Sequence, residues 1–209
     1  MAELISATYV GCVAEAVELL SQGELVAYPT DTVYGLGAAA TNDDAVRRLY
    51  AVKGRPMDKA MPLLIADAGD ASWVAEVTPA ARTLMGKFWP GPLTIVMKRH
   101  PDFRSMALAG GDSVALRVPD QDVVREIIRA LRSPLTGTSA NRAGARAPVS
   151  ASEVAFALGD LVPIVIDGGK APGGDASTII DITVTPFEVV REGAVSRQEL
   201  REALGKDLA

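Results

Sequence analysis

Along most of the chain, short apolar runs alternate with segments in which apolar residues recur every three or four positions. Between Val13 and Leu20 this spacing is helical, and Gly23 is placed to end the helix. Leu25 to Tyr28 is an apolar run typical of a buried strand. The pattern therefore predicts a helix that leads into a strand at the start of the chain.

Polar residues at the ends of the periodic segments mark where further helices begin. Thr78-Pro79 combines an N-cap with proline at the first helical position, and Ser196 with Glu199 forms a capping box. We expect helices from Thr41 or Asn42, from Thr78, across Asp120 to Leu131, after Ser150, and from Ser196 to Gly205.

Short apolar runs between these helices predict further strands. Interleaved strands and helices indicate an α/β fold with one open sheet of mixed strand direction, flanked by helices. No repeat, low-complexity tract or linker interrupts the pattern, so we expect a single domain over residues 1–209. The expected strands are Pro62 to Ala66, Leu93 to Met97, Ser113 to Val118, Val162 to Ile166, Thr178 to Ile182 and Glu188 to Arg191.

Composition narrows the class of protein. With 209 residues, 48% of them hydrophobic, the chain is long enough for one sizeable core. Its formal net charge of -5 repels polyanions, so any nucleic acid must be bound by a local patch. No run approaches the roughly 20 apolar residues of a membrane span, and the N-terminus lacks the pattern of a signal peptide. We expect a cytoplasmic protein without membrane contact.

The chain has one cysteine and one histidine, which limits the available chemistry. Cys12 lies among helix-forming apolar residues, and we interpret it as a small core side chain. His100 lies in a polar turn after an apolar run. A surface turn explains His100, which argues against a histidine-based triad and a His-rich metal site.

Hydroxyl groups follow the first strand closely, at Thr30, Thr32 and Tyr34. Such a segment can place side chains at the edge of a sheet, facing a ligand. It can equally form a capped turn in which Asp31 and the threonines satisfy local backbone groups. The segment alone leaves both interpretations open.

Three cations, Lys53, Arg55 and Lys59, crowd a short loop after a helix, and Pro56 prevents the helix from continuing. Like charges this close need an anion between them or full solvation. Arginine suits a bidentate phosphate contact, and lysine supplies a mobile point charge. The loop is therefore either a phosphate site or a solvated basic loop.

Ser139 and Asn141 follow another apolar run, and Arg142 and Arg146 come next in a loop rich in small residues. If the chain is extended there, the two-residue spacing puts both polar side chains on one face, able to bind one ligand. The alternative is a turn with Asn141 in the left-handed conformation. We also hypothesise that the loop 142–148 closes over a ligand.

Residues 167–178 are rich in glycine and lead to Ser177 at the start of an expected strand. The glycines allow close approach of a ligand, but the spacing of a Walker A loop is absent. Arg117 and Arg191 stand among apolar neighbours. Because burying an arginine without an anionic partner is costly, each is either an edge residue or a ligand for carboxylate or phosphate.

Taken in order, these segments resemble the YrdC-like family, in particular its L-threonylcarbamoyladenylate synthases. The family signature of Lys-x-Arg followed far downstream by Ser-x-Asn is present as Lys53-Gly-Arg55 and Ser139-Ala-Asn141. Tyr28 to Gly37 is similar to the N-terminal segment of the family, and the resemblance runs from about Gly23 to about Gly193. It implies a single YrdC-like domain whose twisted sheet has a concave ligand-binding face.

The resemblance also implies an activity. Members of this kind are nucleotidyltransferases that join L-threonine, bicarbonate and ATP, with Mg²⁺ on the phosphates and no organic cofactor. The product is the first intermediate of N6-threonylcarbamoyladenosine at position 37 of tRNAs reading codons that start with A. A transient contact with the threonylcarbamoyl-transferase complex and weak or indirect tRNA binding are expected. An RNA-binding module of the same fold, or a relative acting on another small molecule, remains an alternative.

Specific roles follow from the same resemblance. Lys53, Arg55, Ser139 and Asn141 are expected to support catalysis, and no protein side chain is expected to bind the metal. Leu64 stands where relatives often have histidine, so a polar role at that position is lost. Without a histidine or paired carboxylates as general base, catalysis should depend on positioning and electrostatics. The resemblance assigns L-threonine to Thr32, Leu64, Arg117, Ser139 and Ser177, and ATP to Arg55, Lys59, Ser113, Asn141, Val149 and Arg191.

Overall fold

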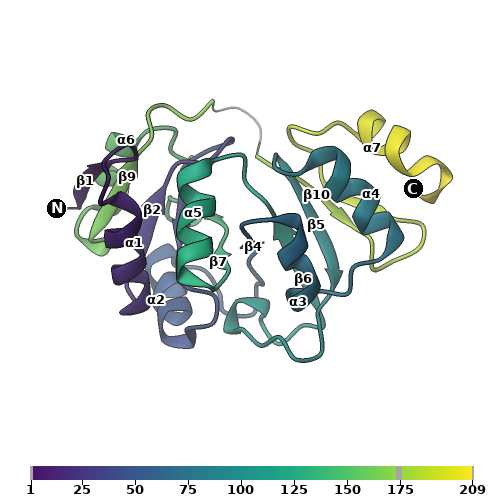
Figure 1. The fold of residues 1–209 in the computed structure, drawn as a ribbon, viewed down its shortest axis with the longest axis horizontal. Coiled ribbons are helices and arrows are strands. Elements are labelled where there is room, and N and C mark those ends of the chain that lie inside the picture. Colours follow the sequence, from purple (N-terminus) through teal and green to yellow (C-terminus); the bar gives the residue numbers. More distant parts are fainter. Residues whose placement is uncertain (1, 173–175, 209) are drawn as a thin grey trace.

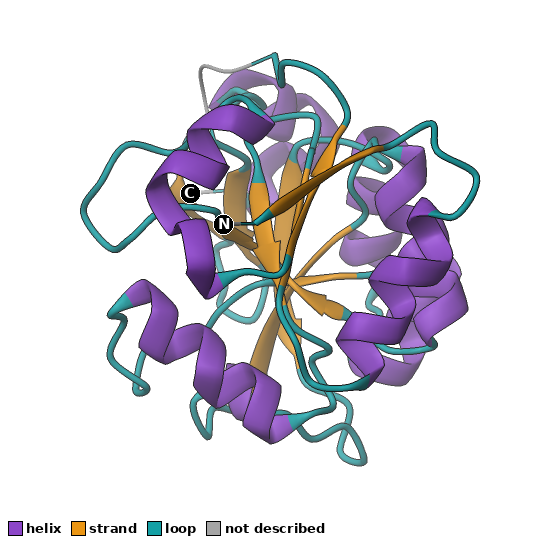
Figure 2. Ribbon diagram, turned by 90° about the vertical axis from the view of Figure 1, so that its left-hand side faces the viewer, coloured by secondary structure: helices purple, strands orange, loops and turns teal. Residues whose placement is uncertain are grey.

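Strands and helices alternate along the chain in the computed structural model, which describes residues 2–172 and 176–208 (Figure 1). The helices lie on both sides of the strands (Figure 2). A mixed α/β fold is therefore confirmed. The helices are α1 (Cys12–Ser21), α2 (Asp43–Lys53), α3 (Ala71–Val74), α4 (Pro79–Phe88), α5 (Asp122–Leu131), α6 (Ala151–Leu158) and α7 (Arg197–Leu204).

Within the described residues the strands form two sheets, where the sequence pattern predicts one. Each sheet contains both parallel and antiparallel strand pairs. The first sheet has the order β1 (Glu3–Ser6), β9 (Ile164–Asp167), β2 (Val26–Tyr28), β3 (Gly35–Gly37) and β8 (Thr138–Ser139). The second has the order β11 (Glu188–Arg191), β10 (Thr178–Asp181), β5 (Leu93–Lys98), β6 (Ser113–Arg117), β4 (Leu63–Leu64) and β7 (Leu135–Thr136).

The predicted helix starts are borne out by their caps. The Asn42 side chain accepts hydrogen bonds from two backbone N–H groups of the first turn of α2, and Thr78 caps α4 with Pro79 in its first turn. Ser150 caps α6, and the Ser196–Glu199 capping box opens α7. These starts are local in origin, because each cap bonds backbone groups within three residues. Local sequence therefore suffices to find them.

The strand β3 is not foreseen by the pattern, because its glycines do not resemble a strand. The buried ring of Tyr28 lies against this strand: a Cβ atom on Gly35 would lie 2.5 Å from Tyr28 Cε2, and one on Gly37 would lie 2.6 Å from Tyr28 Cε1. Tyr28 Oη donates a hydrogen bond to the Thr136 carbonyl, 2.8 Å away in the other sheet. Glycine is thus needed for the ring to reach that partner.

Thr136 joins the two sheets. Its backbone N–H donates to the Ala38 carbonyl at 3.0 Å, and its Oγ1 accepts from the Ala38 N–H at 2.9 Å. On one side of this junction α1 packs beside α5, over a core that includes the fully buried Cys12. The interpretation of Cys12 as a core side chain is confirmed. Among the helices of the described chain, none has the length and apolar character needed to span a membrane.

Candidate functional site

A pocket of about 510 Å³ opens between the two sheets. Its walls come from segments far apart in the sequence, which the junction at Thr136 brings together. Two thirds of the residues predicted for the site line this pocket: Thr32, Arg55, Leu64, Ser113, Arg117, Ser139, Ser177 and Arg191. The others, Lys53, Lys59, Asn141 and Val149, are not among its lining residues.

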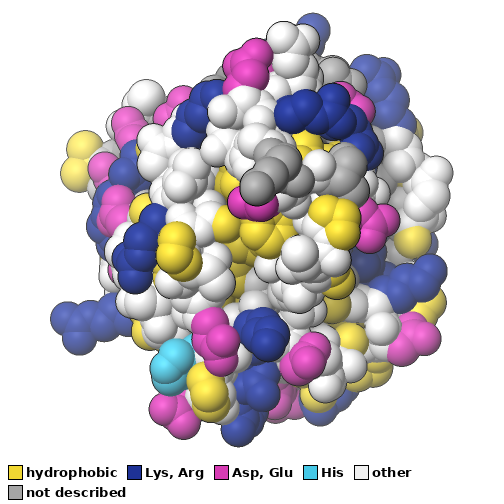
Figure 3. All heavy atoms as spheres, turned by 90° about the vertical axis from the view of Figure 1, so that its right-hand side faces the viewer, with side chains coloured by type: hydrophobic (Ala, Val, Ile, Leu, Met, Phe, Trp, Pro, Cys, Tyr) yellow, Lys and Arg dark blue, Asp and Glu magenta, His cyan; other side chains and the backbone are white. Residues whose placement is uncertain are grey.

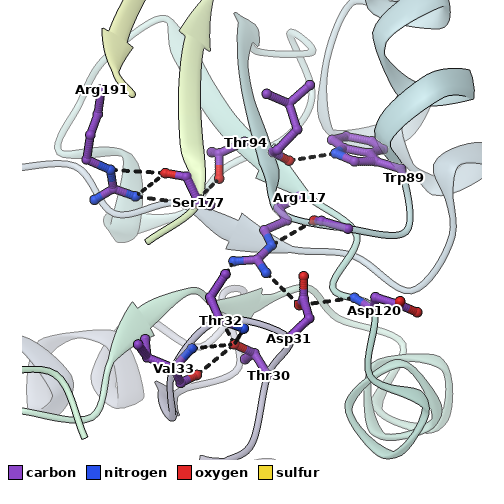
Figure 4. A network of polar contacts seen from close by, with 12 residues as sticks. Thr30, Asp31, Thr32, Val33, Trp89, Thr94, Arg117, Asp120, Ser177 and Arg191 are labelled. Carbon is purple, nitrogen blue, oxygen red and sulfur yellow. Dashed lines mark hydrogen bonds and ion pairs between the residues drawn. The ribbon is translucent and has the colours of Figure 1, made fainter. Parts of the chain in front are cut away.

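Arg117 is the buried cation of the pocket, with 6% of its surface exposed. Its Nη2 pairs with Asp31 Oδ1 at 2.5 Å, its Nη1 donates to Thr32 Oγ1 at 3.3 Å, and its Nε donates to the Gly91 carbonyl at 3.0 Å (Figure 4). Burial lowers the pKa of Arg117, and the adjacent Asp31 carboxylate acts against that shift. The guanidinium is therefore held at the end of β6 as a fixed cation.

The turn after β2 contains elements of both interpretations of its hydroxyls. Thr30 Oγ1 donates to the Val33 carbonyl at 2.6 Å and accepts from the Thr32 N–H at 3.1 Å, so Thr30 caps the turn. Thr30 and Thr32 both line the pocket. The alternative in which Asp31 satisfies local backbone groups is wrong: besides Arg117 it accepts from the Asp120 N–H at 3.2 Å, 89 residues away in the sequence.

A second arginine approaches the pocket from β11. Arg191 donates through Nε and Nη2 to the Ser177 carbonyl at 3.1 and 2.8 Å, and through Nη2 to Ser177 Oγ at 3.1 Å. Ser177 Oγ also lies 2.9 Å from Thr94 Oγ1, so these groups form a chain (Figure 4). Partial burial, followed by the charge of Arg117, lowers the pKa of Arg191. An anion between the two arginines would relieve this repulsion.

Thr94 is a pocket residue that sequence reasoning misses. It is 1% exposed and stands within the apolar strand β5, where a single hydroxyl resembles a tolerated core threonine. The parallel pairing of β10 with β5, which sets Ile179 opposite Thr94, places it beside Ser177. The sequence signal is only a threonine within an apolar run.

Lys53 does not belong to a loop of three cations, as its sequence context suggests. It is the last residue of α2, it is 5% exposed, and its Nζ donates to the Ser139 and Asn141 carbonyls at 2.5 and 2.8 Å and to Asn141 Oδ1 at 3.3 Å. Burial, with a smaller effect from Arg55, lowers the pKa of Lys53 to about 8. Lys53 therefore fixes the turn 139–141 from behind.

Ser139 and Asn141 contact each other. Ser139 Oγ donates to Asn141 Oδ1, and Asn141 Nδ2 donates to the Ala145 carbonyl at 2.5 Å. The alternative with Asn141 in the left-handed conformation is wrong, because its φ is not positive. Ser139 is thus the member of the pair that reaches the pocket, while Asn141 connects it to the loop that follows.

The remaining predicted residues surround these groups. Arg55 donates to the Lys59 and Ala60 carbonyls at 3.1 and 2.8 Å, and Lys59 is exposed. The Val149 N–H donates to Glu153 Oε2 at 2.8 Å, and the Val149 carbonyl accepts from the Ala171 N–H at 2.8 Å. Part of the glycine-rich segment, residues 173–175, lies outside the described residues.

The charge of the pocket follows from this arrangement. Of the described residues that line it, Arg55, Arg117 and Arg191 are cationic and none is a carboxylate. Within the same part of the chain, no three His, Cys, Asp or Glu side chains are grouped to hold a metal ion. Outside the pocket, charged groups of both signs are mixed on the face near α4 and α7 (Figure 3). The site therefore suits a small ligand with several negative charges.

The family model of the Sua5, YciO and YrdC proteins, described as "Telomere recombination", matches residues 18–193. The chain belongs to this family. The resemblance seen in the Lys-x-Arg and Ser-x-Asn motifs is thereby confirmed.

Curated relatives carry a common name. The threonylcarbamoyl-AMP synthase of Bacillus subtilis (strain 168) is 36% identical over 195 residues, which are 92% of this chain and 56% of that protein. A putative threonylcarbamoyl-AMP synthase of Mycobacterium tuberculosis (strain H37Rv) is 36% identical over 203 residues, covering 94% of this chain and 91% of that protein. The chain thus spans just over half the length of some relatives and nearly all of others.

Solved structures share the fold. Pyrococcus abyssi Sua5 complexed with L-threonine has a TM-score of 0.91 and 33% identity, covering 98% of this chain and 61% of that chain. Escherichia coli YciO has a TM-score of 0.85 and 25% identity, covering 96% of this chain and all of that one. The YrdC-like architecture is therefore established for this chain.

Proposed function

We propose that this chain is an L-threonylcarbamoyladenylate synthase, a nucleotidyltransferase that acts in the cytoplasm on L-threonine, bicarbonate and ATP. The observation that carries the proposal is the pocket between the sheets, where Arg55, Arg117 and Arg191 stand without a lining carboxylate among the described residues. Such a pocket favours a ligand with a carboxylate and phosphates. Relatives named threonylcarbamoyl-AMP synthase and the threonine complex of P. abyssi Sua5 support the choice of substrates.

Each substrate has its own position in this proposal. The carboxylate of L-threonine binds Arg117 near Thr32 and Ser177, with Leu64 as an apolar wall. The phosphates of ATP bind Arg55 and Arg191 from the other side, and Lys59, Ser113 and Val149 lie at its periphery. Mg²⁺ enters on the phosphates, which supply its ligands in place of protein carboxylates.

The proposed reaction forms two bonds in sequence. The uncharged amine of threonine attacks carbon dioxide or bicarbonate and forms an N-carboxylate. A proton passes from the amine to solvent in the carbon dioxide route, and water leaves in the bicarbonate route. An oxygen of this carboxylate then attacks the α-phosphorus of ATP, and the bond to pyrophosphate breaks. The arginines stabilise the charge that grows on the departing pyrophosphate, and the fixed turn 139–141 holds the substrates close together. Lys53 and Asn141 act through that turn.

The product is the activated group that a threonylcarbamoyl-transferase complex places on adenosine 37 of tRNAs reading codons that start with A. In this proposal the chain meets that complex transiently and contacts tRNA weakly or indirectly.

The test is a synthesis assay. Purified chain is incubated with ATP, Mg²⁺, L-threonine and labelled bicarbonate, and pyrophosphate release is followed while each substrate is omitted in turn. We expect release only with all of them. Arg55→Ala should lower kcat/KM by about 100-fold or more. Arg47 is an exposed arginine of α2, so the control variant Arg47→Ala should leave kcat/KM unchanged. Pyrophosphate release without threonine would contradict the proposal, and equal turnover with serine or glycine would contradict its specificity.

A further inference from the structure

The Asp31–Arg117 ion pair ties the two sheets together beneath the pocket. Asp31 follows β2 of the first sheet, and Arg117 ends β6 of the second. The side chains are 14% and 8% exposed, and Figure 4 shows them pointing toward each other from separate segments. Arg117 lines the pocket and Asp31 does not. The carboxylate therefore lies behind the guanidinium, on the side away from a ligand.

Some N–H donors of Arg117 have no hydrogen-bond partner within the described chain. A guanidinium has five N–H donors. Asp31, Thr32 and the Gly91 carbonyl take one donor each. Two N–H groups of a fixed, pocket-lining cation thus have no hydrogen-bond partner within the described chain. Two donors are what a carboxylate needs for a bidentate contact.

The contacts of Asp31 suggest that stability alone does not explain the pair. Asp31 Oδ1 accepts from both Arg117 and the Asp120 N–H, whereas Oδ2 is buried and has no hydrogen-bond partner among the described residues. An orphaned buried oxygen is unfavourable, and a buried ion pair is often no more stable than apolar residues of similar volume. The arrangement does fix the plane and position of the guanidinium.

We propose that Asp31 is a positioning residue: it holds Arg117 so that the two remaining N–H groups receive the carboxylate of the amino-acid substrate. The inference rests on the proposed function, in which Arg117 receives the carboxylate of L-threonine. Asp31 also compensates the charge of Arg117 before the ligand arrives, so the cation is buried without an anionic ligand. Because Asp31 orients the guanidinium that receives the carboxylate, binding of the carboxylate is more sensitive to Asp31 than binding of ATP.

The experiment measures the Kd of L-threonine and of ATP by calorimetry for the wild-type chain and for Asp31→Asn. The amide keeps the size of the side chain and removes its charge. We expect the Kd of L-threonine to rise by about 10- to 100-fold, as for a lost hydrogen bond between charged groups, while the Kd of ATP changes less than about twofold. The matched control is Asp67→Asn, which breaks contacts to Arg125 and Arg129 outside this pocket and should change neither Kd.

A conservative variant keeps the test decisive if Asp31→Asn does not fold, as judged by circular dichroism. Asp31→Glu retains the charge but moves it by one methylene, so we expect a roughly threefold or larger rise for L-threonine alone. An unchanged or lower Kd of L-threonine in both variants, or an equal loss for both ligands, would overturn the inference. A wild-type chain that fails to bind L-threonine or ATP would instead contradict the proposed function.

Discussion

The cationic side chains of the pocket region differ in what holds them. Arg117 has a carboxylate, Arg191 has the carbonyl and hydroxyl of Ser177, and Lys53 has backbone carbonyls of the turn 139–141 together with the Asn141 side-chain oxygen. Only the first pair is electrically neutral. The positive charge of Arg191 is therefore not compensated by a carboxylate and can attract an anionic ligand. The Lys53 ammonium donates its hydrogen bonds to the turn 139–141 instead.

The buried lysine leads to a prediction about stability and pH. The pKa of Lys53 falls from 10.5 to about 8 on folding, so between pH 8 and 10.5 the unfolded chain binds a proton that the folded chain does not. The free energy of unfolding of the wild type should therefore rise with pH across this window, relative to Lys53→Met, by about 2–3 kcal/mol. Urea titrations of both proteins from pH 7 to 10.5 measure the difference.

The same comparison contains its own control, because every other titrating group is common to the two proteins. Stability curves that stay parallel from pH 7 to 10.5 would show that the pKa of Lys53 does not fall on folding.

At the scale of elements, the two sheets depend on the contact between the Tyr28 ring and β3. The ring occupies the space that side chains would take on Gly35 and Gly37, and its hydroxyl reaches Thr136 in the other sheet. The Tyr28 ring and these two glycines thus contribute to the junction that forms the pocket, together with the Thr136–Ala38 hydrogen bonds and the Asp31–Arg117 pair. Close packing leaves such a contact little room to adjust.

We therefore predict that Gly35→Ala is destabilising. The new Cβ would lie 2.5 Å from the buried Tyr28 ring, and overpacking of this kind typically costs about 1–3 kcal/mol. Gly86→Ala in α4 is the matched control, because its Cβ meets nothing within 4 Å and alanine favours a helix by about 0.5–1 kcal/mol. Thermal unfolding of the two variants should shift in opposite directions. A Gly35→Ala protein as stable as the wild type would contradict the tight contact.

At the scale of the whole molecule, the net charge of -5 bears on the alternative of an RNA-binding module. The described charged residues that line the pocket are all arginines, while the face near α4 and α7 carries both signs (Figure 3). A small anion is drawn into the pocket, but a long polyanion also meets the acidic remainder of the surface.

We predict that tRNA binds with a Kd of about 10⁻⁴ to 10⁻⁶ M or weaker, as is typical of non-specific binding near physiological salt. Added tRNA should leave the rate of pyrophosphate release unchanged. Filter binding over a series of salt concentrations measures the affinity. A submicromolar Kd with a steep salt dependence and no need for ATP would favour the RNA-binding alternative.

The sequence by itself determined the features that depend on near neighbours. The helix starts at Asn42, Thr78, Ser150 and Ser196 follow from caps that bond within three residues, and the mixed α/β class follows from the order of apolar runs. The Lys-x-Arg and Ser-x-Asn motifs, taken in order with the segment Tyr28 to Gly37, indicated the family, which the family model confirms. That the chain is one domain, and that the predicted residues bind threonine and ATP, stay predictions.

Only the tertiary structure decided which polar groups meet. Asp31 and Arg117 are 86 residues apart, Lys53 and Asn141 are 88 apart, and Thr94 and Ser177 are 83 apart. No local pattern chooses such partners, because strand pairing and the junction of the two sheets bring them within hydrogen-bond distance. The pocket, the position of Lys53 behind the turn and the part played by Asp31 therefore belong to the fold, since each depends on contacts between distant segments.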